Sequence, residues 1–445
     1  MHSSDFPVFN RRHFLKHMLG YSAMALPGIA FVQRLRAAAP ALKKQNKSLI
    51  VLWMSGGPSH MDTWDLKPDS QNGGEFKPIK TSVPGIEISQ HLPTVAKQMK
   101  HLSVVRSLVT NEGSHERGRV LMHTARPPSV VVSYPSIGAV AAHELSPKDV
   151  SLPAFISIGR PADGPGFLGM NYAPFTVQNP GQPPTNIQTP AGVDELRIRR
   201  RQQLFYAVED NFRTSLVSSL DKEEQAKHTD AAAAHTEIYG KAFNLVADRS
   251  GKKVFDLRSE PASLLREYGA TGNFGRGCLQ ARKLVEAGVT CVEVDLGGWD
   301  NHQNIFPTLS RNLLPQLDKG MGTLVKDLVD RGLWDNTVVV WMGEFGRTPR
   351  INQNAGRDHW ARCWSVVLGG GGLEGGIAYG ATSKDGTDVV SDGCSVGDLF
   401  ATLYKAVGID PDTRIRDLGG RPHKIAGDDG KPITALLKKS ATAAT

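Results

Sequence analysis

The stretch "TVVVWMGEFGRTPRINQNAGRDHW" (Thr337–Trp360) guides the fold prediction, because a buried strand leads directly into a dense group of ionisable residues. Its first part, "TVVVW" (Thr337–Trp341), is short, β-branched and bounded by the turn-forming residues "WDN". From Met342 to Trp360 the chain carries one Glu, three Arg, one Asp and one His. Such a group indicates either structural ion pairs or a site that holds a metal and a substrate.

Outward from this stretch, the chain alternates between predicted strands and predicted helices. The predicted strands are Ser48–Met54, Leu102–Thr110, Ala154–Gly159, Val289–Leu296, Thr337–Met342 and Cys363–Gly372, and the helices of the C-terminal half are Cys278–Gly288, Leu313–Gly332 and Val396–Gly408. Strand–helix alternation at this spacing predicts a three-layer α/β/α sandwich around a mostly parallel sheet.

One main domain is predicted over residues 42–437, followed by a disordered tail at 438–445. Within it, a Gly/Pro-rich segment reaching Gly192 is predicted to be a long loop. A charged block at about 194–241 is predicted to be a helical insertion, in which "RIRRR" (Arg197–Arg201) is interpreted as a solvated face. The four cysteines form no CxxC pair, so zinc ribbons and dense disulfide scaffolds are not expected, although one disulfide is compatible with the sequence.

The first 41 residues predict a Tat-type signal peptide. "NRRHFLK" (Asn10–Lys16) carries twin arginines, a run without Asp, Glu, Lys or Arg follows, and "APA" (Ala39–Ala41) forms a cleavage site. Gly, Ser and Pro interrupt the apolar run, which is too short to span a membrane comfortably, so no stable transmembrane anchor is expected. We expect export by the Tat translocon to the periplasm or the extracellular space.

Composition argues against a nucleic-acid partner. The chain has 445 residues, of which 40% are hydrophobic and 22% charged, as in a soluble globular protein with a sizeable core. Residues 1–41 contribute five basic and one acidic side chain to the formal net charge of +8, so the mature chain is near +4. This mild excess is not concentrated in one patch.

Polar residues follow four separated strands of the predicted sheet. They are Ser55, Ser59, His60, Asp62, Thr63 and Asp65 after the first strand, Thr110, Asn111, Ser114 and His115 after the second, Asp300 and His302 after Val289–Leu296, and Glu344, Arg347, Arg350, Asp358 and His359 after Thr337–Met342. Ligands of open α/β sheets bind outside the carboxyl ends of the strands, so these segments are predicted to meet at one edge.

This mixture of carboxylates and imidazoles suits a divalent metal, namely Zn²⁺, Mn²⁺, Ca²⁺ or Mg²⁺. The candidate ligands are Asp62, Asp300, His302, Glu344, Asp358 and His359. Arg347 is predicted to bind a tetrahedral oxyanion through paired N–H donors. His123 is interpreted as a packing residue. The alternative is a set of buried Glu–Arg pairs that only hold the core in register, but we prefer a functional metal site.

Three segments closely resemble the domain-of-unknown-function 1501 family over nearly the whole mature chain. They are "SGGPSHMDTWDLKPD" (Ser55–Asp69), "CLQARKLVEAGVTCVEVDLGGWDNH" (Cys278–His302) and "GEFGRTPRINQNAGRDHW" (Gly343–Trp360). That family is often labelled sulfatase-like and is grouped with the alkaline-phosphatase-like superfamily. The resemblance therefore implies an alkaline-phosphatase-like α/β/α sandwich with metals at the strand ends.

By position, the resemblance implies that Asp300 and His302 are one ligand pair and that His359 is the last histidine ligand. It also implies that Asp62 is the ligand from the first strand, and that Thr110 or Ser114 is the nucleophile. The chain departs from the superfamily in three ways: "SGG" replaces the first Asp, "GEFG" lacks the expected His, and no CxPSR-like sulfatase motif is present.

The leading prediction is an exported, metal-dependent hydrolase of phosphate or sulfate esters, with a small-molecule or polysaccharide ester as substrate. The alternative is a non-catalytic binding or scaffold protein that retains the same fold. A site in which Arg347 and Arg350 fully neutralise Glu344 and Asp358 without metal would favour this scaffold.

Overall fold

The computed structural model describes residues 47–147, 152–189, 192–217, 236, 239–240, 242–247 and 251–439. The predicted signal peptide lies outside the described residues, as do residues 440–445 of the tail and much of the second half of the helical insertion, so these remain predictions. In the described part of the chain, no helix is both long and apolar enough to cross a membrane.

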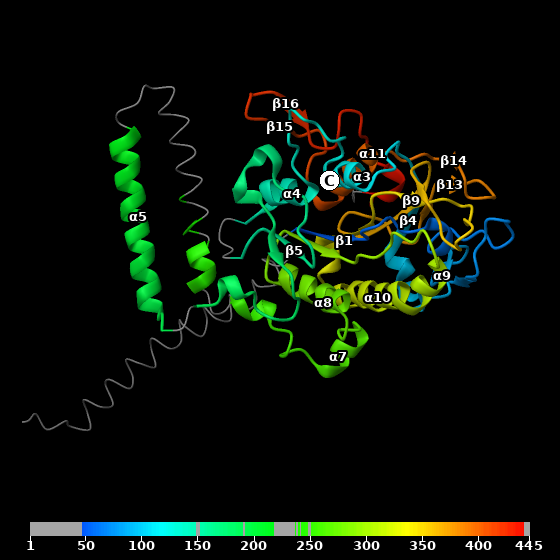
Figure 1. Ribbon diagram of the computed structural model, residues 1–445, viewed down its shortest axis with the longest axis horizontal. Coiled ribbons are helices and arrows are strands. Elements are labelled where there is room, and N and C mark those ends of the chain that lie inside the picture. Colours follow the sequence, from blue (N-terminus) through cyan, green and yellow to red (C-terminus); the bar gives the residue numbers. More distant parts are fainter. Residues whose placement is uncertain are drawn as a thin grey trace, which may run out of the picture. The chain divides into compact units, whose positions relative to one another are not determined.

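A mixed sheet of eight described strands forms the centre of the protein (Figure 1). In spatial order the strands are β12 (Ala378–Tyr379), β4 (Leu102–Leu108), β11 (Trp364–Gly370), β8 (Thr337–Met342), β1 (Ser48–Trp53), β7 (Cys291–Asp295), β5 (Phe155–Ile158) and β6 (Phe175–Val177). All neighbouring pairs are parallel except those that include β11, which runs antiparallel to both β4 and β8. The prediction of a mostly parallel sheet is confirmed.

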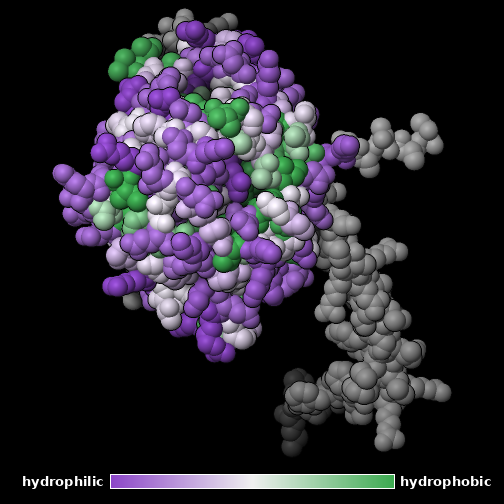
Figure 2. Space-filling model, turned by 90° about the vertical axis from the view of Figure 1, so that its right-hand side faces the viewer, coloured by the Kyte–Doolittle hydropathy of each residue, from purple (hydrophilic) through white to green (hydrophobic). Residues whose placement is uncertain are grey.

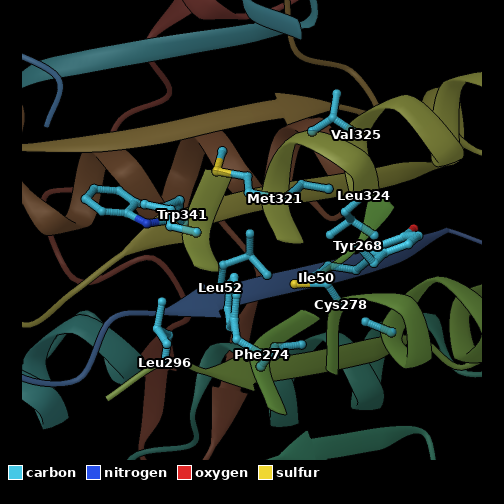
Figure 3. Packing of buried hydrophobic residues seen from close by; sticks show 14 of the residues in the cluster. Ile50, Leu52, Tyr268, Phe274, Cys278, Leu296, Met321, Leu324, Val325 and Trp341 are labelled. Carbon is cyan, nitrogen blue, oxygen red and sulfur yellow. The ribbon is translucent and has the colours of Figure 1, made fainter. Parts of the chain in front are cut away.

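Both faces of the sheet are buried, which explains the continuous apolar runs of its strands. Along β1, Ile50 and Leu52 belong to one apolar cluster, whereas Leu49 and Val51 belong to another on the opposite face. Successive side chains of a strand point to opposite faces, so β1 contributes to two cores. Figure 3 shows the first core, in which Ile50 and Leu52 lie near residues from two helices.

Helices cover the sheet on both sides and complete the α/β/α sandwich (Figure 1). The first apolar cluster includes side chains of α2 (Pro93–Gln98), α8 (Asn273–Glu286) and α10 (Leu314–Asp330). The second includes side chains of α3 (His115–Thr124), α4 (Ile137–Leu145) and α11 (Val396–Val407). The three helices predicted in the C-terminal half correspond to α8, α10 and α11.

Further elements lie outside these layers. They are the helices α5 (Glu195–Val217), α7 (Ala262–Glu267) and α9 (Ile305–Thr308), and the two-stranded pairs β2 (Pro78–Lys80) with β3 (Glu87–Ser89), β9 (Gly346–Arg347) with β10 (His359–Trp360), β13 (Ala381–Thr382) with β14 (Val389–Ser391), and β15 (Arg414–Arg416) with β16 (Pro422–Lys424). On the face in Figure 2, apolar side chains form small separate patches among polar ones.

Two expectations change in the light of the structure. The Gly/Pro-rich segment before Gly192 is not all loop, because β6 extends the sheet beside β5; only three residues long, this strand lacks a clear sequence pattern. All four cysteines lie in the described part of the chain, where they are buried and free, so no disulfide forms among them.

Candidate metal centre

Four segments reach the same edge of the sheet. The strands β1, β7 and β8 are parallel, so the turn after Trp53, the loop after Asp295 and the turn after Met342 emerge together. Because β11 is antiparallel to both neighbours, β4 also ends at this edge, just before α3. For the same reason β11 begins here, directly after β10. The predicted convergence of these segments is therefore present in the fold.

The β9–β10 hairpin brings Arg347 beside His359. These two residues pair directly in the antiparallel register, which closes the loop of residues 348–358 over the strand ends. Thr348 and Asp358 hold the loop together, since the Thr348 backbone N–H donates to Asp358 O at 2.8 Å. The signature "GEFGRTPRINQNAGRDHW" is thus one folded unit at the edge of the sheet.

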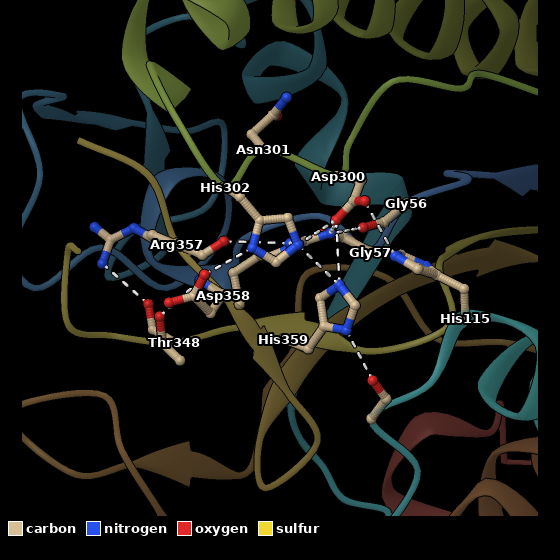
Figure 4. A network of polar contacts seen from close by, with 12 residues as sticks. Gly56, Gly57, His115, Asp300, Asn301, His302, Thr348, Arg357, Asp358 and His359 are labelled. Carbon is tan, nitrogen blue, oxygen red and sulfur yellow. Dashed lines mark hydrogen bonds and ion pairs between the residues drawn. The ribbon is translucent and has the colours of Figure 1, made fainter. Parts of the chain in front are cut away.

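Asp300 is the centre of the polar network in Figure 4. Its Oδ1 lies 2.9 Å from His302 Nε2 and 3.2 Å from His359 Nε2, and its Oδ2 lies 3.3 Å from His115 Nε2. The Arg347 Nη2 also contacts Oδ1, at 2.5 Å. Three imidazoles from three different segments therefore point their Nε2 atoms at one carboxylate.

The carboxylate of Asp300 is ionised under ordinary conditions. Partial burial opposes its charge, but the hydrogen bond and the positive charge of Arg347 outweigh burial and lower the pKa of Asp300 to about 2. The hydrogen bond to Glu344 raises the pKa of His115, whereas burial lowers the pKa of His359. The environment therefore favours the protonated form of His115 and the neutral form of His359.

Glu344 orients His115 by contacting Nδ1, the ring nitrogen that does not face Asp300. Its Oε1 accepts a hydrogen bond from the Gly56 backbone N–H at 2.8 Å and lies 2.7 Å from His115 Nδ1. Carboxylates commonly hold the second nitrogen of a metal-binding imidazole in this way. The other oxygen, Oε2, is buried and has no hydrogen-bond partner among the described residues, nor does His115 Nε2. His115 Nε2 nevertheless lies 3.3 Å from Asp300 Oδ2, so it faces that carboxylate.

His302 has a similar carboxylate partner in Asp358. His302 Nδ1 lies 2.6 Å from Asp358 Oδ1, and the same oxygen accepts a bond from Asn352 Nδ2 at 3.2 Å. The hydrogen bond from His302 lowers the pKa of Asp358. Asp358 therefore contacts Nδ1 of His302 and orients the imidazole so that its Nε2 faces Asp300.

Arg347, which the sequence predicts to bind an oxyanion, contacts protein atoms in this structure. Its side chain is fully buried, and four of the five N–H donors of its guanidinium have oxygen acceptors within the protein. These acceptors are Gly57 O for Nε, Arg357 O for Nη1, and Gly56 O and Asp300 Oδ1 for Nη2, and Nη1 also lies 3.4 Å from His302 Nε2. Arg347 therefore fixes the loops that carry the candidate ligands.

Asp62 lies apart from this network in a separate ion pair. Its Oδ2 is 2.7 Å from Arg357 Nε and its Oδ1 is 3.1 Å from Arg357 Nη2, and both side chains are fully buried. Ser59 Oγ donates a third hydrogen bond, at 2.6 Å. This carboxylate is thus neutralised by an arginine, which local sequence cannot reveal because the two residues are 295 positions apart.

The two nucleophile candidates occupy different environments. Thr110 lies in the loop after β4, where its Oγ1 accepts a bond from the Glu112 backbone N–H at 3.2 Å. Ser114 is exposed and is the N-cap residue of α3, and its side chain makes no capping hydrogen bond among the described residues. It lies between Gly113, whose carbonyl oxygen is 2.8 Å from His359 Nδ1, and His115. Ser114 is therefore the candidate adjoining the cluster.

His115 is one of the polar residues that follow the second predicted strand, but it is not among the ligands predicted from the sequence. Its place in the cluster depends on how α3 packs, so the position after a strand end was the only available signal. His123 is not a simple packing residue either, because it lies 3.2 Å from Glu293 and 3.0 Å from Asp163. Glu293 is buried and Asp163 is partly buried, and both come from distant segments, which explains the difference.

The residues present fit a divalent metal. His115, Asp300 and His359 each offer one ligand atom, and these atoms lie within 4.8 Å of one another. Imidazole and carboxylate ligands suit Zn²⁺ or Mn²⁺. The buried His115 Nε2 makes no hydrogen bond among the described residues, and it lies 3.3 Å from Oδ2 of Asp300, another candidate ligand. Arg347 occupies one oxygen of Asp300, so Oδ2 is the oxygen left to face His115.

Comparisons with solved structures give only distant similarities. A sulfatase, PsFucS1, from Pseudoalteromonas sp. is 13% identical with a TM-score of 0.39, over 89% of this chain and 73% of that chain. A protein in the alkaline phosphatase superfamily from Vibrio parahaemolyticus is 12% identical with a TM-score of 0.35, over 86% and 69%. TAB5 alkaline phosphatase with Mg bound is 10% identical with a TM-score of 0.34, over 82% and 99%. The fold assignment rests on the strand order and helix layers above.

The family of the chain is shown by its amino-acid sequence. No curated protein matches the chain. The family described as "Protein of unknown function (DUF1501)" matches residues 46–437, which is most of the sequence and includes every residue of the candidate metal centre. The chain therefore belongs to the DUF1501 family.

Proposed function

We propose that the protein is a metal-dependent hydrolase of phosphate or sulfate esters. The observation that supports this most directly is the convergence of three imidazole Nε2 atoms on Asp300, all within 3.3 Å of its carboxylate oxygens. His115, Asp300 and His359 would hold the metal. A divalent metal bound there would polarise the phosphoryl or sulfuryl oxygen and offset its developing negative charge.

The chain's own residues supply the remaining requirements for ester cleavage. Ser114 offers an exposed hydroxyl at the first turn of α3, where the free backbone N–H groups and the helix dipole favour a bound anion. In this proposal, Ser114 Oγ loses its proton as it attacks the phosphorus or sulfur, the bond to the ester oxygen breaks, and that oxygen takes up a proton and leaves as the alcohol. Water then hydrolyses the serine ester and releases phosphate or sulfate.

Neutralisation of Glu344 and Asp358 by Arg347 and Arg350 would have favoured the scaffold alternative. Instead, Glu344 and Asp358 contact His115 and His302, and the carboxylate that Arg347 contacts is that of Asp300. Carboxylates that orient imidazoles are typical of metal sites, so this arrangement favours the hydrolase.

The decisive experiment is metal analysis of the mature protein purified without chelator. Asp300→Asn is compared with the matched control Asp417→Asn, because Asp417 also contacts a histidine, His423, at 2.8 Å. We expect a stoichiometric divalent metal in the wild type and the control but not in Asp300→Asn, together with hydrolysis of p-nitrophenyl phosphate or sulfate.

The opposite outcome is equally clear. If the wild type takes up no Zn²⁺, Mn²⁺, Ca²⁺ or Mg²⁺ even after incubation with each ion, the hydrolase proposal fails and the scaffold interpretation is left. Metal that persists in a folded Asp300→Asn protein would also count against the proposed site.

A further inference from the structure

A buried ion-pair cluster lies at the opposite end of α3 from the metal centre. His123, in the last turn, is 1% exposed. Its Nε2 is 3.2 Å from Glu293 Oε2 and its Nδ1 is 3.0 Å from Asp163 Oδ2. Two acidic partners for one buried imidazole exceed what packing alone requires, so the cluster needs an explanation.

The cluster ties α3 to two other elements. Glu293 belongs to β7, the strand whose following loop carries Asp300. Asp163 follows β5 and also contacts Arg119 Nη1 of α3. In addition, the His123 ring packs on the Trp53 ring of β1, with 4.1 Å between ring centroids. The last turn of α3 is thus attached to the strands that build the candidate metal centre.

The middle of α3 lies directly against the turn after β8. A Cβ atom on Gly118 would be 3.1 Å from Glu344 O and 3.2 Å from Phe345 Cδ1. Glu344 in turn contacts His115 Nδ1 at 2.7 Å. His123 and His115 are about 12 Å apart along the axis of α3. Because a helix of this length is nearly rigid, a shift of His123 also shifts His115.

We propose that His123, together with Glu293 and Asp163, is a positioning residue for the metal centre. It contacts none of the candidate ligands, but it fixes α3, and through α3 it fixes where Ser114 and His115 stand relative to Asp300. The part of this inference that concerns metal affinity rests on the proposed function; the part that concerns the placement of α3 does not.

The test uses the double variant His123→Phe/Glu293→Gln, which removes both charges of one buried pair and keeps most of the side-chain volume. The matched control is His423→Phe/Asp417→Asn, which removes another pair of a histidine and a carboxylate, 2.8 Å apart, from the β15–β16 region. Two quantities are measured on the mature chain: amide hydrogen exchange of residues 113–118 in metal-free protein, and the Kd for Zn²⁺ alone.

We expect faster exchange at 113–118 and a Kd for Zn²⁺ raised about tenfold or more in the double variant, because supporting contacts of a metal site commonly have effects of that size. The control should change neither quantity. A folded double variant with wild-type exchange and wild-type Zn²⁺ affinity would overturn the positioning role.

Two further outcomes also decide the inference. If the double variant does not fold, Asp163→Asn is measured in the same way, and its exchange at 113–118 is judged by the same criterion. If the wild type binds no Zn²⁺, the Kd is measured for Mn²⁺, Ca²⁺ and Mg²⁺, and the proposed function fails only if none of these ions binds. In either case, faster exchange in the metal-free double variant supports the role of His123 in placing α3, and unchanged exchange overturns it.

Discussion

At the scale of single residues, Ser114 and Thr110 differ in what surrounds their hydroxyl groups. The Thr110 Oγ1 takes part in a loop turn, whereas the Ser114 hydroxyl is exposed beside the cluster. We predict that Ser114→Ala lowers turnover of a phosphate or sulfate ester by about 10³-fold or more, because it removes the attacking atom. Metal content should not change, as measured on the same preparation.

The matched comparison is Thr110→Val, which removes a hydroxyl of the same loop region. Its turnover should stay near that of the wild type. If Thr110→Val is inactive while Ser114→Ala retains activity, the assignment of the nucleophile is reversed.

Asp62 illustrates a residue whose role is structural although its type suggests a ligand. Both Asp62 and Arg357 are fully buried, and removing one partner of such a pair leaves an unpaired charge in the core. We predict that Asp62→Asn lowers the free energy of unfolding by about 3 kcal/mol, measured by urea denaturation. The folded variant should retain the wild-type metal content.

This prediction separates two roles for one carboxylate. Loss of metal at unchanged stability would instead make Asp62 a ligand, as its position after the first strand suggests.

At the scale of elements, the turn after β1 approaches the loop after β7 so closely that only glycine fits. Gly56 has a φ of +115°, and a Cβ there would collide with the backbone of Trp299 and Asp300. We predict that Gly56→Ala lowers the free energy of unfolding by about 3 kcal/mol or more and removes metal binding. Thermal unfolding and metal analysis measure both effects.

Gly85 provides the control, because its φ is +82° but a Cβ atom there would meet no atom within 4 Å beyond its chain neighbours. Gly85→Ala should lower the free energy of unfolding only by the backbone strain, about 1 kcal/mol, and should leave metal binding intact. Equal effects of the two substitutions would show that backbone strain, not the close approach, matters.

The attachment of α3 gives a pH dependence of stability. Burial alone would lower the pKa of His123, but Glu293 from β7 and Asp163 from the loop after β5 raise the pKa of His123 to about 10. Because the folded-state pKa exceeds the ordinary value of 6.5, this stabilisation is complete below pH 6.5. It is lost as the pH rises toward 10.

We therefore predict that the Tm of the wild type falls between pH 7 and pH 10 more steeply than that of His123→Phe/Glu293→Gln. Calorimetry across this range tests the difference. Parallel curves for the two proteins would mean that the His123 cluster does not titrate in this window.

At the scale of the whole molecule, the candidate metal centre joins segments that follow four strands of the sheet. A metal bound only by the folded chain would stabilise it by about 2.7 kcal/mol when the free metal concentration is 100 times Kd. We predict that EDTA lowers the Tm of the wild type, that added metal restores it, and that Asp300→Asn responds to neither. An EDTA-independent Tm in metal-loaded wild type would contradict this coupling.

Much of the sandwich was predictable because its signals are local. The β-branched run of β8 and the helical spacing of α8 and α10 appear within single short segments, and the rule for parallel strands then places their following residues at one edge. Asp300, His302 and His359 were found in this way. The three-residue strand β6 was not, since so short a strand has no recognisable period.

The α/β/α sandwich and the edge at which its ionisable residues gather follow from the amino-acid sequence, because periodicity and strand ends are properties of short segments. Which of those residues meet follows from the folded arrangement of the segments. Asp62 pairs with Arg357, 295 positions away, and His115 with Glu344, 229 positions away. Such pairings depend on strand order, on the antiparallel course of β11 and on the packing of α3, which act between segments and leave no local pattern.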